Sequence, residues 1–295
     1  MPDADTPRDA ADCPVCRSEA QRRPAVRLPY GRISTCAACG SGILEPRPGR
    51  VRLGELHGSD DYFNHPYFEQ RRQVTVAAAA EARLRRIEAV TGPLDGKRLV
   101  DVGCDIGQFV DFAQTRRGMV ATGVDIFSRV VEIGRAEGRD LHVGTLDQVG
   151  FEAADVDVVT GFDLIEHVDD PVDFLGEVHR ILKPGGVVSL ETPNYGGLIY
   201  RVGRALDRLS PIRPVLKTLQ ARLWPPFHVQ YFTKDSLARR LSDSGFKVLS
   251  VEGRELTGDE LAIAQPFLRA GVSGLLRTAR IIRMPTVLDA VAVKI

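Results

Sequence analysis

The sequence predicts an α/β fold with a doubly wound, mostly parallel sheet and a small cysteine-rich domain in front of it. Two observations carry this prediction. From residue 97 onward, short apolar segments alternate with segments of helical periodicity. Before residue 45, four cysteines form two CxxC pairs. The predicted division is a ribbon over 1–45, a linker and helix over 46–96, and the α/β domain over 97–295.

The composition is that of a globular protein and argues against several classes. The 295 residues carry 39 basic and 39 acidic side chains, and 43% of them are hydrophobic. Zero net charge argues against a protein that coats nucleic acid. The first twelve residues do not resemble a secretory signal, and no apolar run approaches the ~20 residues of a membrane span. We therefore expect a cytoplasmic protein whose cysteines are thiols or metal ligands. The sequence gives no indication of an oligomeric state.

The cysteine pairs are Cys13 with Cys16 and Cys36 with Cys39, with nineteen residues between them. Each CxxC turn brings two thiolates to one side, and two such turns complete a tetrahedral sulfur shell for zinc. Four cysteine ligands leave no open position, so this zinc ion would be structural. A redox role or a chance arrangement of cysteines is the alternative.

The elements of the α/β domain follow one another in order. The linker before this domain is expected to contain a helix over 70–90, and within the domain Asp170 is expected to cap a helix that begins at Pro171. Strands are expected at 98–102, 120–124, 141–143, 156–161, 187–190, 246–251 and 287–293. Helices are expected at 109–117, 128–137, 171–182, 234–244 and 260–282.

Two features at predicted strand ends point to a nucleotide-like cofactor. Gly103 and Gly107 lie in the turn after the first strand, where glycines let the backbone approach a ligand and the next helix begins. Asp125 ends the second strand, where a carboxylate accepts hydrogen bonds from both ribose hydroxyls of an adenosine-containing cofactor. Taken singly, the glycine pair could be a tight turn and the aspartate a cap.

Together, the motifs from residue 97 to the C-terminus resemble class I S-adenosylmethionine-dependent methyltransferases. They are Asp101-Val-Gly-Cys-Asp-Ile-Gly107, Val124-Asp125, Gly161-Phe-Asp-Leu-Ile-Glu-His-Val168, Leu182-Lys-Pro-Gly-Gly186, Phe227-His-Val-Gln-Tyr-Phe-Thr233, Ser236-Leu237 and Ser244-Gly-Phe246. The ribbon is similar to one fused to certain methyltransferases of sugar and natural-product pathways. The resemblance implies a seven-stranded, Rossmann-like sheet whose last strand is antiparallel to the rest.

The resemblance also implies S-adenosylmethionine as cofactor and assigns residues to it. The methionine part of the cofactor would face Asp101 and the loop with Gly103, Cys104, Asp105 and Gly107. The ribose would face Asp125 and Ile126, and the adenine would face Leu146 and Asp147. Phe162 and Asp163 would line the pocket. Asp105 departs from the family, which usually has glycine there. Cys104 is interpreted as a small buried filler rather than a nucleophile.

Methyl transfer to a hydroxyl group needs alignment and a base, and three residues are candidates for the acceptor side. In similar sugar C-methyltransferases a histidine in a motif like that of His228 is the base; a loop histidine bonded to a carbonyl is the alternative. His167, with Asp163 and Glu166, matches a set associated with a divalent cation in similar ubiquinone-pathway O-methyltransferases, although it could simply cap a turn. Tyr195 follows the fifth strand, and its alternative is a ring in the core.

Residues 196–230 are expected to form a helical lid inserted into the sheet topology. The segment carries one acid, Asp207, against six basic residues: Arg201, Arg204, Arg208, Arg213, Lys217 and Arg222. This favours an anionic acceptor, such as a nucleotide-linked sugar or a carboxylate, or contact with an acidic membrane surface. An amphipathic surface helix with a solvated basic face is the alternative.

The function expected is methyl transfer from S-adenosylmethionine to an oxygen or carbon of a small molecule: a sugar, nucleotide-sugar or secondary metabolite. An RNA methyltransferase guided by the ribbon is one alternative, but residues 1–60 hold nine basic and eight acidic side chains, without a basic footprint. A ribbon on a degenerate, non-catalytic methyltransferase fold is the other alternative, and Asp105 is its support.

Overall fold

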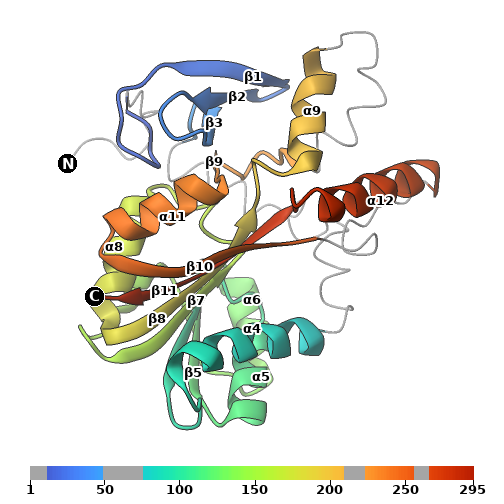
Figure 1. Ribbon diagram of the computed structural model, residues 1–295. Helices are drawn as coiled ribbons and strands as arrows, with labels where there is room; N and C mark the ends of the chain where they lie inside the picture. The colour runs from blue at the N-terminus through green and yellow to red at the C-terminus, as the bar shows by residue number, and fades with distance from the viewer. Residues whose placement is uncertain (1–11, 49–75, 209–222, 256–265) are drawn as a thin grey trace.

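A seven-stranded sheet with helices on both faces forms the centre of the molecule (Figure 1). Its strand order in this computed structural model is β10-β11-β8-β7-β4-β5-β6. The parallel strands are β4 (Arg98–Val102), β5 (Val120–Asp125), β6 (Leu141–Val143), β7 (Val156–Phe162) and β8 (Leu182–Pro193). The last strand, β11 (Val287–Lys294), is antiparallel to β8 and to β10 (Phe246–Arg254), as predicted.

The structure describes residues 12–48, 76–208, 223–255 and 266–295. The predicted lid residues Arg213, Lys217 and Arg222 lie outside these ranges, as do the side chain of Arg208 and the start of the helix predicted over 70–90. Within the described ranges, no helix has the length and apolar character needed to cross a bilayer.

Helices cover the two faces of the sheet as the alternating pattern predicted. One face carries α4 (Val76–Thr91), α5 (Gln108–Arg117) and α6 (Ser128–Ala136); the other carries α7 (Leu146–Val149), α8 (Pro171–Ile181) and α11 (Lys234–Asp243). Asp170 caps α8 by accepting a hydrogen bond from the Val172 N–H at 2.8 Å. Strand β8 begins directly after α8, earlier than the predicted 187, because Leu182 already pairs with Val156 before a bulge.

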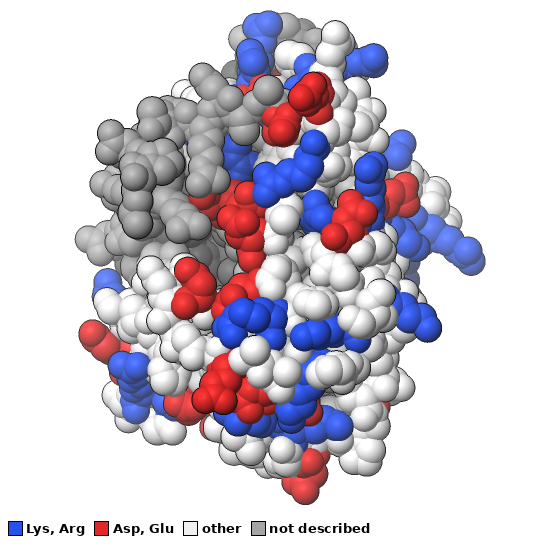
Figure 2. Space-filling model, turned by 90° about the vertical axis from the view of Figure 1, so that its left-hand side faces the viewer, with Lys and Arg blue, Asp and Glu red and all other residues white. Residues whose placement is uncertain are grey.

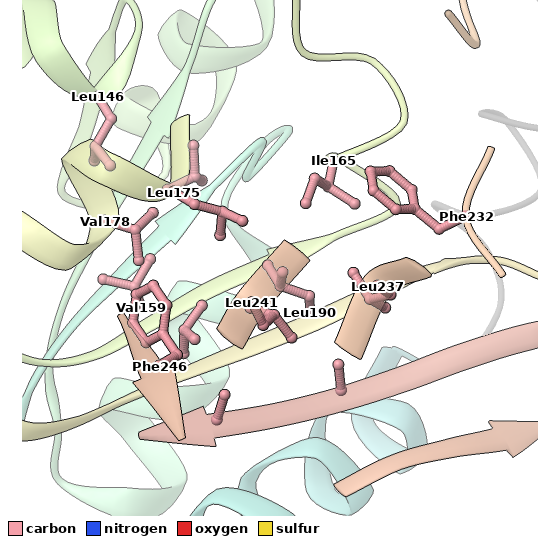
Figure 3. Close-up of a cluster of buried hydrophobic side chains, with 14 of the residues drawn as sticks. Leu146, Val159, Ile165, Leu175, Val178, Leu190, Phe232, Leu237, Leu241 and Phe246 are labelled. Carbon is pink, nitrogen blue, oxygen red and sulfur yellow. The ribbon is translucent and has the colours of Figure 1, made fainter. Parts of the chain in front are cut away.

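The larger hydrophobic core lies between the sheet and the helices α8 and α11 that cover one of its faces. Leu175 and Val178 of α8 converge there with Leu237 and Leu241 of α11 and with Phe246 (Figure 3). The same cluster includes residues of the N-terminal ribbon: Cys13, Val15, Cys36 and Ile43. Because the ribbon shares this core, its folding and that of the large sheet stabilise each other.

The ribbon forms a second, four-stranded sheet of order β1-β2-β3-β9. Strands β1 (Arg22–Leu28), β2 (Gly31–Cys36) and β3 (Gly42–Glu45) are an antiparallel meander, with a hairpin between β1 and β2. Strand β9 (Gln230–Tyr231) comes from the far end of the lid segment and pairs with β3. The domain boundary at residue 45 stays a prediction, and the ribbon sheet takes its fourth strand from beyond it.

A further helix stands beside the ribbon, and a second helix lies below the first (Figure 1). The lid segment contains α9 (Leu198–Arg208), which contacts β1 and α12 (Pro266–Ile281). Ile199 and Tyr200 of α9 are buried, and they share a hydrophobic cluster with Val26 and Ile33 of the ribbon and with Trp224. The described part of the lid therefore packs against the ribbon with its apolar side.

Candidate functional site

The turn after β4 has the backbone conformation that its glycines predicted. Gly103 and Gly107 have φ values of 73° and 79°, and α5 begins immediately after them. Asp105, between them, has a φ of 51°, in the left-handed region that favours glycine. Its N–H donates to Oδ2 of Asp125 at 2.9 Å. The turn after β4 and the end of β5 are thus joined at one edge of the sheet.

Asp125 is the carboxylate of this edge. It is 7% exposed and also accepts a hydrogen bond from the Phe127 N–H at 3.0 Å. Burial raises the pKa of Asp125 to about 6, although the two backbone donors favour its charged form. Ile126, next in the chain, is 45% exposed. An acidic group is therefore held at the strand end, where the carboxyl ends of parallel strands bind ligands.

The structure places two other predicted loop residues inside the protein. Asp101 is buried, and its Oδ1 accepts a hydrogen bond from Oγ1 of Thr160 on β7 at 2.6 Å. Cys104 is buried in the hydrophobic cluster beneath α5. Burial, followed by the charge of Asp101, raises the pKa of the Cys104 thiol far above its ordinary value. A thiol in this environment stays protonated and is a poor nucleophile.

The residues predicted for the adenine side and for the pocket lie on both faces of the sheet. Leu146 is buried in the core beneath α8, while the exposed Asp147 accepts a hydrogen bond from Oγ1 of Thr145 at 2.6 Å. Phe162 lies in the opposite cluster, under the guanidinium of Arg83 at 3.9 Å. The structure therefore does not bring the side chains of Leu146 and Phe162 together. Asp163 follows β7 in the left-handed region, with a φ of 52°.

Two predicted histidines meet at this edge of the sheet. The ring centroids of His167 and His228 lie 4.5 Å apart at an interplanar angle of 85°. His167 Nδ1 lies 3.1 Å from the carbonyl oxygen of Phe227, and Nε2 lies 4.0 Å from Oε1 of Glu166. Because a carbonyl only accepts, the proton of a neutral His167 lies on Nδ1, and its Nε2 is the basic nitrogen.

Glu166 completes this group from below. Its side chain is fully buried, and Oε2 accepts a hydrogen bond from Oγ1 of Thr192 at 2.8 Å. Among the described residues, Glu166, His167 and His228 offer ligand atoms within 4.8 Å of one another, and Asp163 does not belong to this group. The predicted set of Asp163, Glu166 and His167 is therefore replaced by one that takes His228 from a distant segment.

Tyr195 is a core residue and not a group facing an acceptor. It is 1% exposed, and its hydroxyl group is hydrogen-bonded to Oγ1 of Thr35 in the ribbon at 2.9 Å. The guanidinium of Arg204 on α9 lies 4.1 Å above its ring. The ring thus joins ribbon, sheet and lid, which is the alternative that the sequence left open. The predicted acceptor-side role of Tyr195 finds no support in this geometry.

The four ribbon cysteines converge on one point. The Sγ atoms of Cys13 and Cys39 lie 3.8 Å apart, and those of Cys16 and Cys36 lie 3.9 Å apart. All four atoms lie within 4.8 Å of one another. Zn–S bonds of about 2.3 Å in a tetrahedron require sulfur–sulfur distances of roughly 3.8 Å. The cluster therefore fits a zinc ribbon.

A buried charge network near the same sheet edge has no counterpart in the predicted site. Glu191 of β8 is 2% exposed and binds Arg83 and Arg86 of α4, and Arg86 also binds Asp289 of β11. Burial opposes the charge on Glu191, but the hydrogen bond and charge of Arg83 lower its pKa to about 2. Burial and then the Glu191 charge raise the pKa of Asp289 to about 7. The sequence signal that could have indicated this network is the presence of acidic residues, Glu191 and Asp289, within strands that are otherwise apolar.

Comparisons with known proteins relate this chain to methyltransferases. A family model described as a methyltransferase domain matches residues 67–251. A ubiquinone biosynthesis O-methyltransferase of Leptothrix cholodnii is 34% identical over 183 residues, which cover 59% of this chain and 74% of that protein. Its namesake from Paracidovorax citrulli is 36% identical over 112 residues, 35% of this chain and 46% of that relative. The second match therefore spans less than half of its relative.

The fold is shared with solved structures of low sequence identity. The crystal structure of an S-adenosylmethionine-dependent methyltransferase from Archaeoglobus fulgidus matches with a TM-score of 0.55 at 18% identity, covering 80% of this chain and all of that chain. The family model covers more than half of the 295 residues and includes the turn after β4, Asp125 and His167. The chain therefore belongs to the S-adenosylmethionine-dependent methyltransferases.

Proposed function

We propose that this enzyme methylates an oxygen or carbon atom of a small-molecule acceptor. His167 and His228 would be the general bases on the acceptor side. The observation that supports this most is the contact of the two imidazole rings at 4.5 Å, above a buried carboxylate. The names of the relatives, ubiquinone biosynthesis O-methyltransferase, favour oxygen as the acceptor atom.

The residues around the turn after β4 fit the cofactor. When bound, S-adenosylmethionine supplies an electrophilic methyl group, so the protein has to align the two reactants and remove a proton. We assign the ribose hydroxyl groups to Asp125 and the methionine part to the left-handed turn of Gly103, Asp105 and Gly107. Asp101 supports this turn from inside the protein, through its bond with Thr160.

The histidine pair supplies the base. The acceptor hydroxyl group would give its proton to Nε2 of His167 or to His228, and Glu166 would stabilise the resulting imidazolium. Nε2 of His167 already lies 4.0 Å from Oε1 of Glu166. A charged carboxylate at this distance attracts the imidazolium that forms when the ring takes the proton.

A divalent cation bound by Glu166, His167 and His228 is the second candidate for this site. Two imidazoles and one carboxylate form a set that binds transition metals with open positions for an acceptor. The three ligand atoms lie close enough for this, within 4.8 Å of one another. Metal analysis separates the alternatives: a cation at this site would give a second bound metal ion per chain beside that of the four cysteines, and His228→Asn would lose only the second ion.

In the ribbon, we propose a structural zinc ion. The thiol geometry supports it, since four sulfur ligands saturate the metal. An RNA-guiding role is disfavoured, because Arg17 pairs with Asp170, and Arg22 and Arg32 both pair with Glu45. On the face in Figure 2, basic and acidic side chains of the described residues alternate instead of forming a continuous basic surface.

The decisive experiment uses methyl-labelled S-adenosylmethionine. Calorimetry first measures cofactor binding by the intact protein, and labelled cofactor is then incubated with sugar, nucleotide-sugar and phenolic acceptors. We expect saturable binding and label in one acceptor class, lost in His167→Asn and His228→Asn. Label in bulk RNA and in none of the small molecules would contradict the proposal.

A further inference from the structure

Gln230 holds the turn that carries His167 and lies two residues from His228. Its side chain is completely buried in strand β9. The Nε2 amide donates to the carbonyl oxygens of Ile165 at 2.8 Å and Val168 at 2.9 Å. These two carbonyls flank Glu166 and His167, so one amide group fixes both ends of their turn.

The remaining hydrogen bonds of Gln230 connect this turn to strand β3 of the ribbon and to Arg47, two residues beyond that strand. Oε1 accepts hydrogen bonds from Nη1 and Nη2 of Arg47 at 3.3 and 3.4 Å, and Arg47 also donates to the carbonyl of Asp169. The Gln230 main chain pairs with Ile43 of β3, and its N–H donates to the Glu166 carbonyl at 3.3 Å. Both donors and both acceptor positions of the side-chain amide are therefore used.

We propose that Gln230 is a positioning residue that sets the geometry of His167 and His228 and makes it depend on the ribbon. A fully satisfied buried polar group specifies one arrangement, because any displacement leaves donors or acceptors unpaired in a dry environment. Here the arrangement includes the turn of His167, the strand that follows His228, and β3. The inference rests on the proposed role of the two histidines as the acceptor-side pair.

The main chain adds to the same connection. The Val229 N–H donates to the Glu166 carbonyl at 3.0 Å, and the Leu44 N–H of β3 donates to the Val229 carbonyl at 3.0 Å. A displacement of β3 is therefore transmitted through Val229 and Gln230 to both histidine segments. A glutamine that only filled space would contribute to stability without fixing the imidazoles relative to each other.

The test compares the NMR resonances of the histidine rings in the full chain at one fixed pH, which needs no acceptor. The protein is labelled at histidine Cε1, and His167→Asn and His228→Asn assign the two resonances. Gln230→Met keeps the length of the side chain but removes its hydrogen bonds. Gln114→Met is the matched control, because its Nε2 donates to the Ala121 carbonyl at 3.0 Å, away from the histidines.

We expect Gln230→Met to shift the ring resonances of both histidines, and Gln114→Met to leave them as in the parent. S-adenosylmethionine affinity stays at the parent value in both variants, because the turn after β4 makes no hydrogen bond to Gln230. Arg47→Met, which removes the hydrogen bonds to Gln230 Oε1 and to the Asp169 carbonyl but keeps those of the Gln230 Nε2 amide, shifts the same two resonances by a smaller amount.

Parental ring resonances for both histidines in Gln230→Met would overturn the proposal. If that variant does not fold, Arg47→Met decides, and parental resonances there overturn it as well. The proposed reaction fails separately: full methylation by His167→Asn and His228→Asn would reject the two histidines as general bases, whereas the NMR result would still report whether Gln230 positions the rings.

Discussion

His167 and His228 are 4.5 Å apart, ring to ring, although one follows a central parallel strand and the other precedes the last strand of the ribbon sheet. The contact joins the two parts of the protein that the sequence presents as separate. It also gives the site a basic nitrogen, Nε2 of His167, beside a buried carboxylate.

Removing either ring tests this pair directly. For His167→Asn and His228→Asn we expect kcat to fall by about 10²–10⁴-fold, because a general base contributes this range. The dissociation constant for S-adenosylmethionine, measured by calorimetry, stays the same. His142→Asn is the control, since His142 lies on β6 beside Asp140. A loss of cofactor affinity equal to the loss of rate would place the histidines on the cofactor instead.

Cofactor affinity is expected to depend on the charge of Asp125. In the cofactor-free protein its pKa is raised to about 6, so the carboxylate is increasingly protonated below that pH. Ribose hydroxyl groups donate to the charged form, and affinity should weaken by about tenfold per pH unit below 6. Calorimetry between pH 5 and 7.5 measures this dependence, and Asp125→Asn should bind weakly at every pH.

The same pKa shift predicts the pH dependence of stability without cofactor. The native state holds the Asp125 proton more tightly than the unfolded chain does, because its native pKa is raised. This contribution is fully present below the unfolded pKa and is lost as pH rises toward 6. Urea unfolding across this window should show a smaller loss of stability with rising pH in Asp125→Asn than in the parent.

Asp105→Gly is expected to stabilise the turn after β4. The φ of 51° costs a residue with a side chain about 1 kcal/mol, which glycine avoids. The gain is partly offset by the greater freedom of glycine in the unfolded chain. Urea unfolding should show a net gain of about 0.5 kcal/mol. Asp105→Ala separates charge from conformation, since it removes the carboxylate and keeps the unfavourable φ.

Loss of a ribbon cysteine should destabilise the entire protein. Cys36→Ser removes one sulfur ligand from a cluster whose residues are part of the main core, so the melting temperature should fall together with zinc content. Cys104→Ser is the matched control, as a buried cysteine outside the cluster. Metal analysis with calorimetric melting measures both effects; an unchanged Tm in zinc-free Cys36→Ser would show that the ribbon folds without metal.

Glu191→Gln should be strongly destabilising. It leaves Arg83 and Arg86 with less negative charge in a buried environment, and breaking such a pair costs about 3–5 kcal/mol. It also removes one cause of the raised pKa of Asp289. Urea unfolding measures the loss, and Glu177→Gln, which breaks the exposed pair with Arg180, should stay near the parent value.

Periodicity and spacing predicted most of the fold. Strands such as 98–102 and helices such as that after Asp170 depend on local patterns and on caps. The seven strands and the antiparallel last strand followed from the family resemblance. The four-cysteine cluster was predictable because its ligands lie in two short turns. These features depend on contacts between residues that are near in sequence.

Long-range pairing was not predictable from one sequence. No local pattern indicates that Gln230 continues the ribbon sheet, or that His228 replaces Asp163 beside Glu166. The hydroxyl group of Tyr195 finds its partner, Thr35, 160 positions away in the chain. Whether a polar side chain belongs to the core or to a functional site depends on such distant partners, and only the folded structure shows them.

The origin of β9 has a consequence for how the protein is made. The first three strands of the ribbon sheet leave the ribosome before the large sheet, but the strand that completes the ribbon sheet is translated after the whole parallel part of the large sheet. Until then, β3 is an open edge available for pairing with other chains. A nascent chain halted before residue 230 should therefore be prone to self-association, and a ribbon expressed alone should be more so than the full protein.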